Sequence, residues 1–120
     1  MKILVVQPEK VPEEMEISGS LESMQKVVGG LIQAVYPFED PMALVCNEEG
    51  KLLGLPWNRA LYDDEDKLYE IVAGTFFICG IDSDDFCSLT EEQMETYRKR
   101  FASPEAFILL AGQIIAVPAD

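Results

Sequence analysis

The sequence predicts an α+β fold in which a mainly antiparallel sheet is packed by two main helices. Short β-prone runs recur along the chain and are separated by turn residues rather than by crossover helices. Two segments carry apolar residues at the three-to-four spacing of an amphipathic helix. The helices and strands do not alternate in a β–α–β rhythm, so a parallel sheet is not expected.

A single domain is expected over residues 1–120. A chain of 120 residues falls within the usual length of one domain. Its hydrophobic residues make up 48% of the sequence, which is enough to build a core. No internal repeat, low-complexity segment or linker is visible in the sequence.

The N-terminal part predicts a hairpin followed by a helix. Residues 2–7 form a β-branched apolar run, and residues 15–18 alternate apolar and polar side chains and are expected to pair with it. Ser20 suits an N-cap position, and an apolar stripe follows at Leu21, Met24, Val27 and Val28. The pair Gly29-Gly30 is expected to end the helix, or else to let a ligand approach the backbone closely.

The middle of the chain predicts three further strands, at residues 31–36, 42–46 and 69–72. Residues 47–50, with the sequence NEEG, have the composition of a hairpin turn, so a return strand is expected from residue 51 to residue 53. The run TFFICGI, residues 75–81, is almost continuously apolar. That pattern is typical of a central strand buried on both faces.

The C-terminal part predicts a second helix and a hairpin. Ser88 to Glu91 matches the capping-box pattern, and Met94, Tyr97 and Phe101 then follow at helical spacing. Two apolar runs, residues 106–111 and 113–117, are separated by Gly112. They are expected to form a hairpin that either closes the chain or adds to the sheet edge of a partner, and both arrangements are compatible with a homo-oligomer.

The segment GLPWNRAL, residues 54–61, is the most unusual in the chain. Its proline is expected to open a short helix or 3₁₀ turn that runs through Leu61. Trp57 is the only tryptophan, and Asn58 and Arg59 are suited to binding a carboxylate, a phosphate or a base edge. The alternative is structural: Arg59 pairs with nearby carboxylates while Trp57 covers the core.

The charge balance limits the classes of partner. With 22 acidic and 9 basic residues the net charge is -13, which disfavours binding to nucleic acid or to an anionic membrane. The acidic surface either keeps the protein soluble or is itself recognised by a basic partner. No apolar run approaches the length of a spanning helix, and the N-terminus is typical of a first strand rather than a signal peptide, so a cytoplasmic location is expected.

Few residues are suited to catalysis or metal binding. The chain has no histidine, the commonest general base and metal ligand. Cys46 and Cys79 lie in apolar runs and are expected to be buried, whereas Cys87 and the pair Asp84 and Asp85 are the remaining candidates for chemistry. The acidic loop at residues 63–66 lacks the spacing of a calcium site. No metal site and no cofactor is therefore predicted.

Three segments together resemble a known family: SLESMQKVVGG, VYPFEDPMALVCNEEGKLLGLPWNRAL and IVAGTFFICG. The chain is similar, from Met1 to Phe101, to small uncharacterised bacterial proteins found in phages and other mobile elements and described only as a domain of unknown function. This resemblance implies a mobile-genome setting, in which small accessory proteins often act against host defence. It implies no catalytic residue.

Three functions remain open. In the first, a non-enzymatic protein sequesters a nucleotide-like ligand in a pocket that joins two glycine-containing segments to the GLPWNRAL segment. The residues expected to line that pocket are Gly30, Trp57, Asn58, Arg59 and Thr75. In the second, an acidic decoy imitates DNA and inhibits a basic host defence or restriction protein. The third, an enzyme, is disfavoured because no positioned acid–base pair is present.

Overall fold

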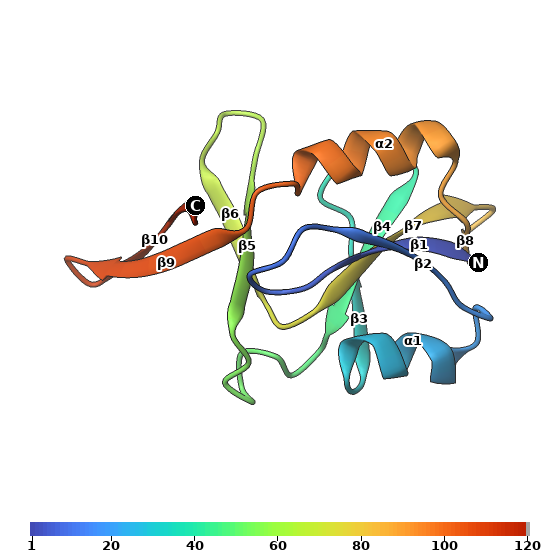
Figure 1. The fold of residues 1–120 in the computed structure, drawn as a ribbon, viewed down its shortest axis with the longest axis horizontal. Helices are drawn as coiled ribbons and strands as arrows, with labels where there is room; N and C mark the ends of the chain where they lie inside the picture. Colours follow the sequence, from blue (N-terminus) through green and yellow to red (C-terminus); the bar gives the residue numbers. More distant parts are fainter. Residues whose placement is uncertain (120) are drawn as a thin grey trace.

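The computed structural model describes residues 1–119, and its largest part is a six-stranded antiparallel sheet (Figure 1). The order along the sheet is β2-β1-β7-β4-β3, and β8 pairs with the far end of β7. The strands are β1 (Lys2–Val6), β2 (Glu13–Glu16), β3 (Ile32–Val35), β4 (Met42–Asn47), β7 (Phe76–Asp82) and β8 (Asp85–Cys87). Together with two helices, this arrangement confirms the α+β class and the mainly antiparallel sheet.

Strand β7 lies at the centre of the sheet, as its apolar sequence predicts. It pairs with β1 on one side and with β4 on the other. Its side chains alternate between two cores: Phe76 and Ile78 belong to one cluster of buried residues, and Phe77 and Cys79 belong to the other. Residues 76–79 are all inaccessible to solvent, which explains why the run contains no polar residue.

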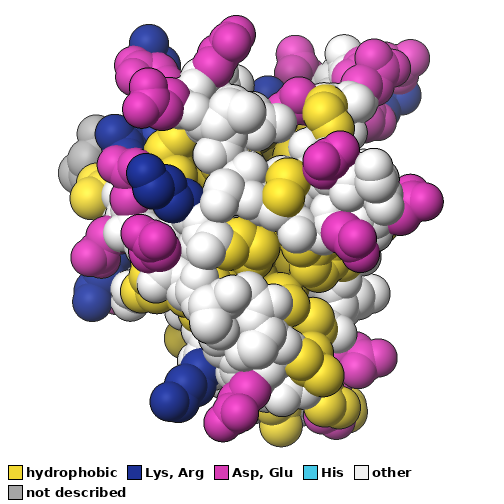
Figure 2. Space-filling model, turned by 90° about the vertical axis from the view of Figure 1, so that its right-hand side faces the viewer, with side chains coloured by type: hydrophobic (Ala, Val, Ile, Leu, Met, Phe, Trp, Pro, Cys, Tyr) yellow, Lys and Arg dark blue, Asp and Glu magenta, His cyan; other side chains and the backbone are white. Residues whose placement is uncertain are grey.

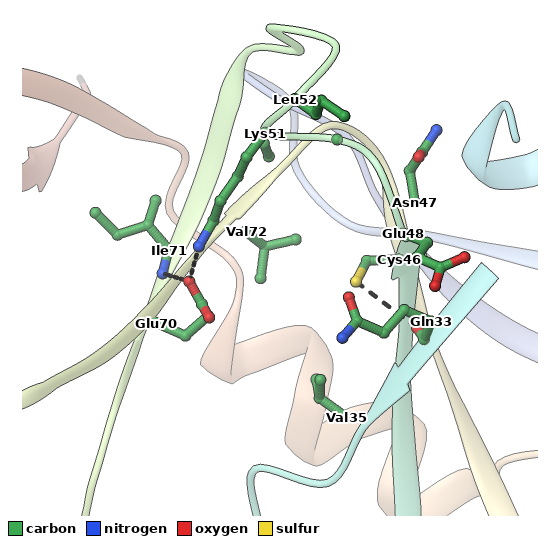
Figure 3. Close-up of a pocket in the computed structure, with 12 residues that line it drawn as sticks. Gln33, Val35, Cys46, Asn47, Glu48, Lys51, Leu52, Glu70, Ile71 and Val72 are labelled. Carbon is green, nitrogen blue, oxygen red and sulfur yellow. Dashed lines mark hydrogen bonds and ion pairs between the residues drawn. The ribbon is translucent and has the colours of Figure 1, made fainter. Parts of the chain in front are cut away.

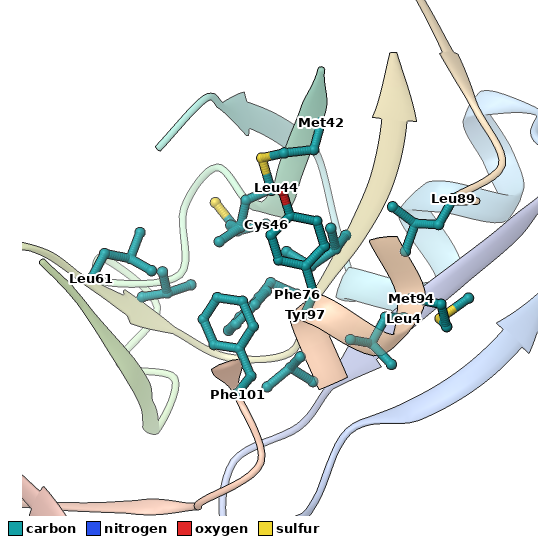
Figure 4. Close-up of a cluster of buried hydrophobic side chains, with 13 residues drawn as sticks. Leu4, Met42, Leu44, Cys46, Leu61, Phe76, Leu89, Met94, Tyr97 and Phe101 are labelled. Carbon is teal, nitrogen blue, oxygen red and sulfur yellow. The ribbon is translucent and has the colours of Figure 1, made fainter. Parts of the chain in front are cut away.

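The two helices cover opposite faces of this sheet (Figure 1). Helix α1 (Leu21–Val28) begins at the N-cap Ser20 and ends at Gly29, whose φ of 79° is the left-handed conformation that favours glycine. Helix α2 (Glu91–Arg100) packs Met94 and Tyr97, together with the C-cap Phe101, onto the other face. Figure 4 shows the core on the α2 side of the sheet, in which these side chains lie with Leu4, Met42, Leu44 and Phe76.

The capping box of α2 lies two residues later than the sequence pattern predicts. Thr90 is the N-cap of α2: its side chain accepts a hydrogen bond from the backbone of Gln93, and the Gln93 side chain accepts one from the Thr90 backbone. Ser88 instead accepts a hydrogen bond from the backbone N–H of Lys2 at 2.8 Å, because the chain is still crossing the sheet edge there. Both serine and threonine suit an N-cap, so composition alone did not separate the two sites.

The segment after β4 differs from both predictions made for it. Residues 51–53 form turns and no return strand, and residues 57–62 form a strand and no helix. That strand, β5 (Trp57–Tyr62), pairs with β6 (Leu68–Ala73) as a separate antiparallel ribbon. Gly50 fixes this exit from the sheet, because a Cβ at that position would lie 2.7 Å from the carbonyl oxygen of Ala73.

The chain closes with a hairpin, as predicted. Strands β9 (Glu105–Leu110) and β10 (Gln113–Pro118) pair with each other as a two-stranded sheet. The hairpin extends away from the main sheet along the long axis of the molecule (Figure 1). Its base lies beside β5, where the rings of Trp57 and Phe107 are 6.5 Å apart.

Candidate functional site

The structure does not bring the predicted ligand-binding residues together in one open pocket. Asn58 and Arg59 have no solvent-exposed surface. A ligand reaches polar groups in this position only if the protein opens. The polar atoms of both side chains are also engaged by the protein itself.

All five N–H groups of the Arg59 guanidinium donate hydrogen bonds within the protein. Nε and Nη2 donate to the carbonyl oxygen of Phe101 at 3.3 and 3.0 Å, and Nη2 also donates to the carbonyl oxygen of Lys10 at 2.8 Å. Nη1 donates to the side-chain and main-chain oxygens of Asn58 at 2.8 and 3.2 Å. Because Phe101 is the C-cap of α2, the cation also lies at the negative end of the helix dipole.

Asn58 extends this network to the main sheet. Its Nδ2 donates to the carbonyl oxygen of Val6, at the end of β1, at 2.8 Å, and to that of Gly74, just before β7, at 2.9 Å. We call these contacts of Asn58 and Arg59 the joint network. It fixes the β5–β6 ribbon, the loop at Lys10 and the end of α2 to the sheet, so the role of both residues in this structure is structural.

Burial has opposing effects on the ionisable groups beside the joint network. It lowers the pKa of Arg59, and the nearby carboxylate of Glu105 opposes that shift. It raises the pKa of Glu105, against the hydrogen bond that the carboxylate accepts from the backbone of Ala60 and the attraction of Arg59. Arg59 therefore has a structural role, as the alternative to ligand binding predicted. Its hydrogen-bond partners, however, are carbonyl and amide oxygens rather than carboxylates.

The other three predicted residues lie in separate places. Gly30 faces Asn47, because a Cβ at Gly30 would lie 2.9 Å from the Asn47 side chain. Trp57 is half-buried beneath the β9–β10 hairpin. Thr75 lines an open and mainly apolar hollow between α1 and the β1–β2 hairpin, together with Met15 and Val27.

A different hollow brings hydrogen-bonding side chains together from distant parts of the chain. We call it the inter-sheet cleft, because it lies between strands β3 and β4 of the main sheet and strand β6 of the ribbon (Figure 3). Its volume is about 270 Å³. It is lined by residues 33, 35, 46–48, 50–52 and 70–73.

The walls of the cleft combine an apolar surface with a few polar groups. Glu70 accepts a hydrogen bond from the ammonium group of Lys51 and another from the backbone of Ile71, so its carboxylate is held in place on the ribbon side (Figure 3). On the sheet side, Gln33 stands opposite Cys46 in the β3–β4 ladder, and the Cys46 thiol donates to the carbonyl oxygen of Gln33 at 3.7 Å. Burial, followed by the charge of Glu70, raises the pKa of that thiol.

This arrangement is suited to binding rather than to covalent chemistry. The Cys46 thiol remains protonated at neutral pH, since its pKa is raised above an already high ordinary value. The ionised groups that line the cleft are Glu48, Lys51 and Glu70, which sum to one negative charge. The Gln33 amide projects toward the hollow and offers both a donor and an acceptor (Figure 3).

Sequence reasoning missed the cleft, although a weak signal was present. Gln33 is a polar residue in the middle of the apolar run LIQAVY, and Glu70 occupies a similar place in LYEIVA. An isolated polar residue in a strand usually indicates only a solvent-facing position. The two strands face each other across the cleft only after the ribbon folds back, and nothing local in the sequence specifies that approach.

The described residues otherwise offer little for chemistry. No group of three potential ligands within residues 1–119 is placed to hold a metal ion. Cys46 and Cys79 are buried, as predicted, and burial raises the pKa of Cys79 to about 12. Cys87 is half-buried beside β7. In the same part of the chain, no helix is long and apolar enough to span a membrane.

The fold and the cleft define a small α+β protein in which a two-stranded ribbon closes a polar-walled hollow against an antiparallel sheet. The chain belongs to the family Domain of unknown function (DUF3846), whose pattern matches residues 1–102. The match covers the main sheet, both helices and the ribbon, and it ends before the β9–β10 hairpin. No curated protein and no solved structure shows significant similarity to the chain.

Proposed function

We propose that the protein is a non-enzymatic binding protein that holds a small nucleoside-like molecule in the inter-sheet cleft. The observation that carries this proposal is the cleft itself, where Gln33 and Glu70 face a common hollow from two different sheets. Its volume of about 270 Å³ is just below the range of sites for drug-sized ligands, so a base or nucleoside is the suitable size. Val35, Ile71 and Val72 supply apolar surface for a flat ring.

Electrostatics favours an uncharged or cationic ligand over a nucleotide. The side chains that line the cleft carry one net negative charge, and the whole chain carries -13. The only lysine in the lining, Lys51, is already paired with Glu70. A phosphate group would therefore meet repulsion both at long range and at the site. This refines the nucleotide-like ligand expected from the sequence to its uncharged nucleoside part.

The test is a calorimetric titration of adenosine, guanosine, cytidine and uridine, each compared with its 5′-monophosphate. We expect at least one nucleoside to bind at a ratio of one per chain. Its monophosphate should bind about tenfold more weakly, the equivalent of one added like-charge contact. Gln33→Leu removes the amide that recognises the base edge and should weaken nucleoside binding about tenfold or more. Glu70→Gln removes one negative charge from the cleft lining and should therefore reduce the difference in affinity between the nucleoside and its monophosphate.

Gln25→Leu is the matched control, since it removes a half-buried amide on α1, which is not part of the cleft lining. It should leave the nucleoside affinity unchanged. The proposal fails if none of the four nucleosides binds, or if Gln33→Leu binds as tightly as the wild type.

The biological setting of this binding is a further part of the proposal. Sequestering a small nucleoside-like signal is one way in which a protein of a phage or mobile element acts against host defence. That setting is implied only by the resemblance drawn from the sequence, since the matched family is described as a domain of unknown function, and the cleft supports only the ligand class.

A second candidate, an acidic decoy for a basic host protein, is favoured by the excess of acidic over basic residues. Arg59 is buried, and salt bridges to glutamate engage Lys51, Lys67, Arg98 and Lys99. Each salt bridge neutralises one carboxylate as well as one cation, so the net charge of -13 is unchanged by this pairing. On the face seen in Figure 2, however, acidic side chains lie around the rim and are separated by uncharged and hydrophobic surface. A duplex presents about one charge per 1.7 Å of axis in continuous rows.

If the protein is an acidic decoy, it should displace a labelled DNA duplex from a basic restriction endonuclease at low salt. The displacement should fall steeply as salt is added. Replacing all four acidic residues of the exposed 63–66 loop by their amides should weaken displacement, and the single change Glu22→Gln should leave it nearly unchanged. Displacement that is insensitive to salt, or absent at low salt, argues against a decoy.

A further inference from the structure

The two walls of the inter-sheet cleft present polar groups with different hydrogen-bonding capacities. Glu70, on β6, presents a carboxylate, which accepts hydrogen bonds and donates none while it is ionised. Gln33, on β3, presents an amide, which donates through its nitrogen and accepts through its oxygen. A ligand that contacts both side chains must therefore carry donor groups on the edge that faces Glu70.

The Glu70 carboxylate is held in place by the protein while one of its oxygens remains available. Its Oε1 accepts hydrogen bonds from the ammonium group of Lys51 and from the backbone N–H of Ile71, the latter at 3.0 Å. Among residues 1–119, no protein group donates to Oε2, and this oxygen turns toward the hollow (Figure 3). A carboxylate fixed in this way loses little freedom when a ligand binds, which favours recognition.

The Gln33 amide is available in the same sense. The hydrogen bond from the Cys46 thiol goes to the main-chain carbonyl oxygen of Gln33, so it leaves the side chain of Gln33 unengaged. The amide projects into the hollow from the wall opposite Glu70 (Figure 3). An amide alone pairs well with adenine, because it accepts from the N6 amino group and donates to N7. The choice of base therefore depends on what Glu70 adds.

The two walls together separate the nucleobases by their donors and acceptors. Guanine carries two adjacent donors, N1–H and the N2 amino group, on one edge, and the acceptors O6 and N7 on the next edge. It donates to Glu70 while it accepts from the Gln33 amide. Adenine pairs with the amide, but its remaining ring nitrogens are acceptors, which a carboxylate repels. Uracil offers one N–H between two carbonyl oxygens, and cytosine offers one amino group beside an acceptor nitrogen.

We propose that the cleft binds guanosine in preference to the other nucleosides, and that Glu70 is the residue that determines this specificity. The inference rests on the nucleoside binding proposed above and names the base. The apolar side chains of Val35, Ile71 and Val72 contact any flat ring equally well, so they supply affinity without discriminating. Discrimination comes from the unpartnered carboxylate oxygen, because two donors of one base face it and no other base offers that pair.

The test is a calorimetric titration of guanosine, inosine and adenosine. We expect guanosine to bind most tightly. Inosine keeps N1–H, O6 and N7 but lacks the N2 amino group, so it should bind about tenfold more weakly, as expected for the loss of one hydrogen bond to a charged group. Adenosine should bind more weakly than guanosine by at least the same factor, because its N1 faces the carboxylate without a proton.

Glu70→Gln should exchange the preference between the two purines. The amide introduced at residue 70 accepts only one of the guanine donors, so guanosine should bind about tenfold more weakly or worse. The same amide donates to N1 of adenine, so adenosine should bind more tightly than it does to the wild type. A variant that merely unfolds or distorts the cleft would lose both ligands, so this exchange distinguishes a role in specificity from a structural one.

Glu48→Gln is the matched control for charge. Glu48 is an exposed residue that follows β4 and also lines the cleft, so its replacement removes the same charge from the lining. It should reduce the difference in affinity between a nucleoside and its monophosphate, as Glu70→Gln does, but it should keep the preference for guanosine over adenosine. Thermal unfolding of both variants verifies that they are folded.

The outcomes separate this inference from the proposed function. If another nucleoside binds most tightly and Gln33→Leu weakens its binding, nucleoside binding in the cleft is supported and the assignment of guanosine is overturned. A guanosine preference that persists in Glu70→Gln overturns the role of Glu70. If none of the nucleosides binds, the proposed function fails and the inference fails with it.

Discussion

Replacing Arg59 with methionine is expected to lower the free energy of unfolding by about 3–5 kcal/mol, the usual cost of removing one member of a buried polar cluster that contains a charge. Methionine has a similar length but donates no hydrogen bond. The carbonyl oxygen of Phe101 and the side-chain oxygen of Asn58 would lose a buried donor, and the carbonyl oxygen of Lys10 would lose a partly buried one. Each buried acceptor left without a partner costs about 1–3 kcal/mol.

Chemical unfolding of wild type and variant measures this difference, and Arg98→Met provides the matched control. Arg98 pairs with Glu14 at the surface, where both side chains are about half exposed. Its loss should cost about 1 kcal/mol or less. Arg59→Lys should lose most of the same stability as Arg59→Met, since one ammonium group does not span three separate acceptors.

Amide hydrogen exchange should show which parts of the protein are destabilised by Arg59→Met. Faster exchange is expected in the β5–β6 ribbon and at the end of α2, which the joint network fixes to the main sheet. If Arg59→Met instead keeps wild-type stability and weakens ligand binding, Arg59 is a ligand residue after all and the structural role assigned to it here is wrong.

Replacing Phe76 with alanine is expected to cost about 3–5 kcal/mol, the range for truncating a fully buried aromatic side chain. Phe76 has no exposed surface and lies on the central strand, on the side covered by α2. Its ring packs edge-on against Phe101 with centroids 5.5 Å apart. The truncation therefore leaves a cavity at the point where the sheet, the end of α2 and the ribbon meet.

Tyr69→Ala is the control for Phe76→Ala, because Tyr69 is also an aromatic residue in a strand but is 57% exposed. Its truncation should change the free energy of unfolding by well under half as much. Urea unfolding at neutral pH measures both. A Phe76 variant that loses less than about 1 kcal/mol would show that the core relaxes around the missing ring, contrary to the packing seen here.

The two predictions differ in how far the sequence alone anticipates them. The apolar run around Phe76 identifies a central buried strand without any structure, because alternation between two buried faces leaves no position for a polar residue. The role of Arg59 was not foreseeable in this way. Its acceptors Lys10 and Phe101 are 49 and 42 residues away, and both bonds go to main-chain oxygens, which every residue possesses.

The same difference between local patterns and long-range contacts explains why the sequence did not identify the residues of the cleft. The hydrogen-bonding capacity that makes Asn58 and Arg59 suited to a ligand is used instead to join elements of the protein. The inter-sheet cleft is made by Gln33 and Glu70, which are unremarkable in their own strands. Donors and acceptors have the same chemistry toward a ligand and toward a backbone, so residue type does not reveal which partner is present.

By itself the sequence determined the α+β class, the central strand, the start and end of α1, and the final hairpin, because each depends on short-range patterns of side-chain polarity and on turn and capping residues. Only the tertiary structure decided that residues 57–62 form a strand of a separate ribbon, that Arg59 is buried in the joint network, and where the cleft lies. These features depend on contacts between segments far apart in the chain, which form only when the whole fold supplies the partners.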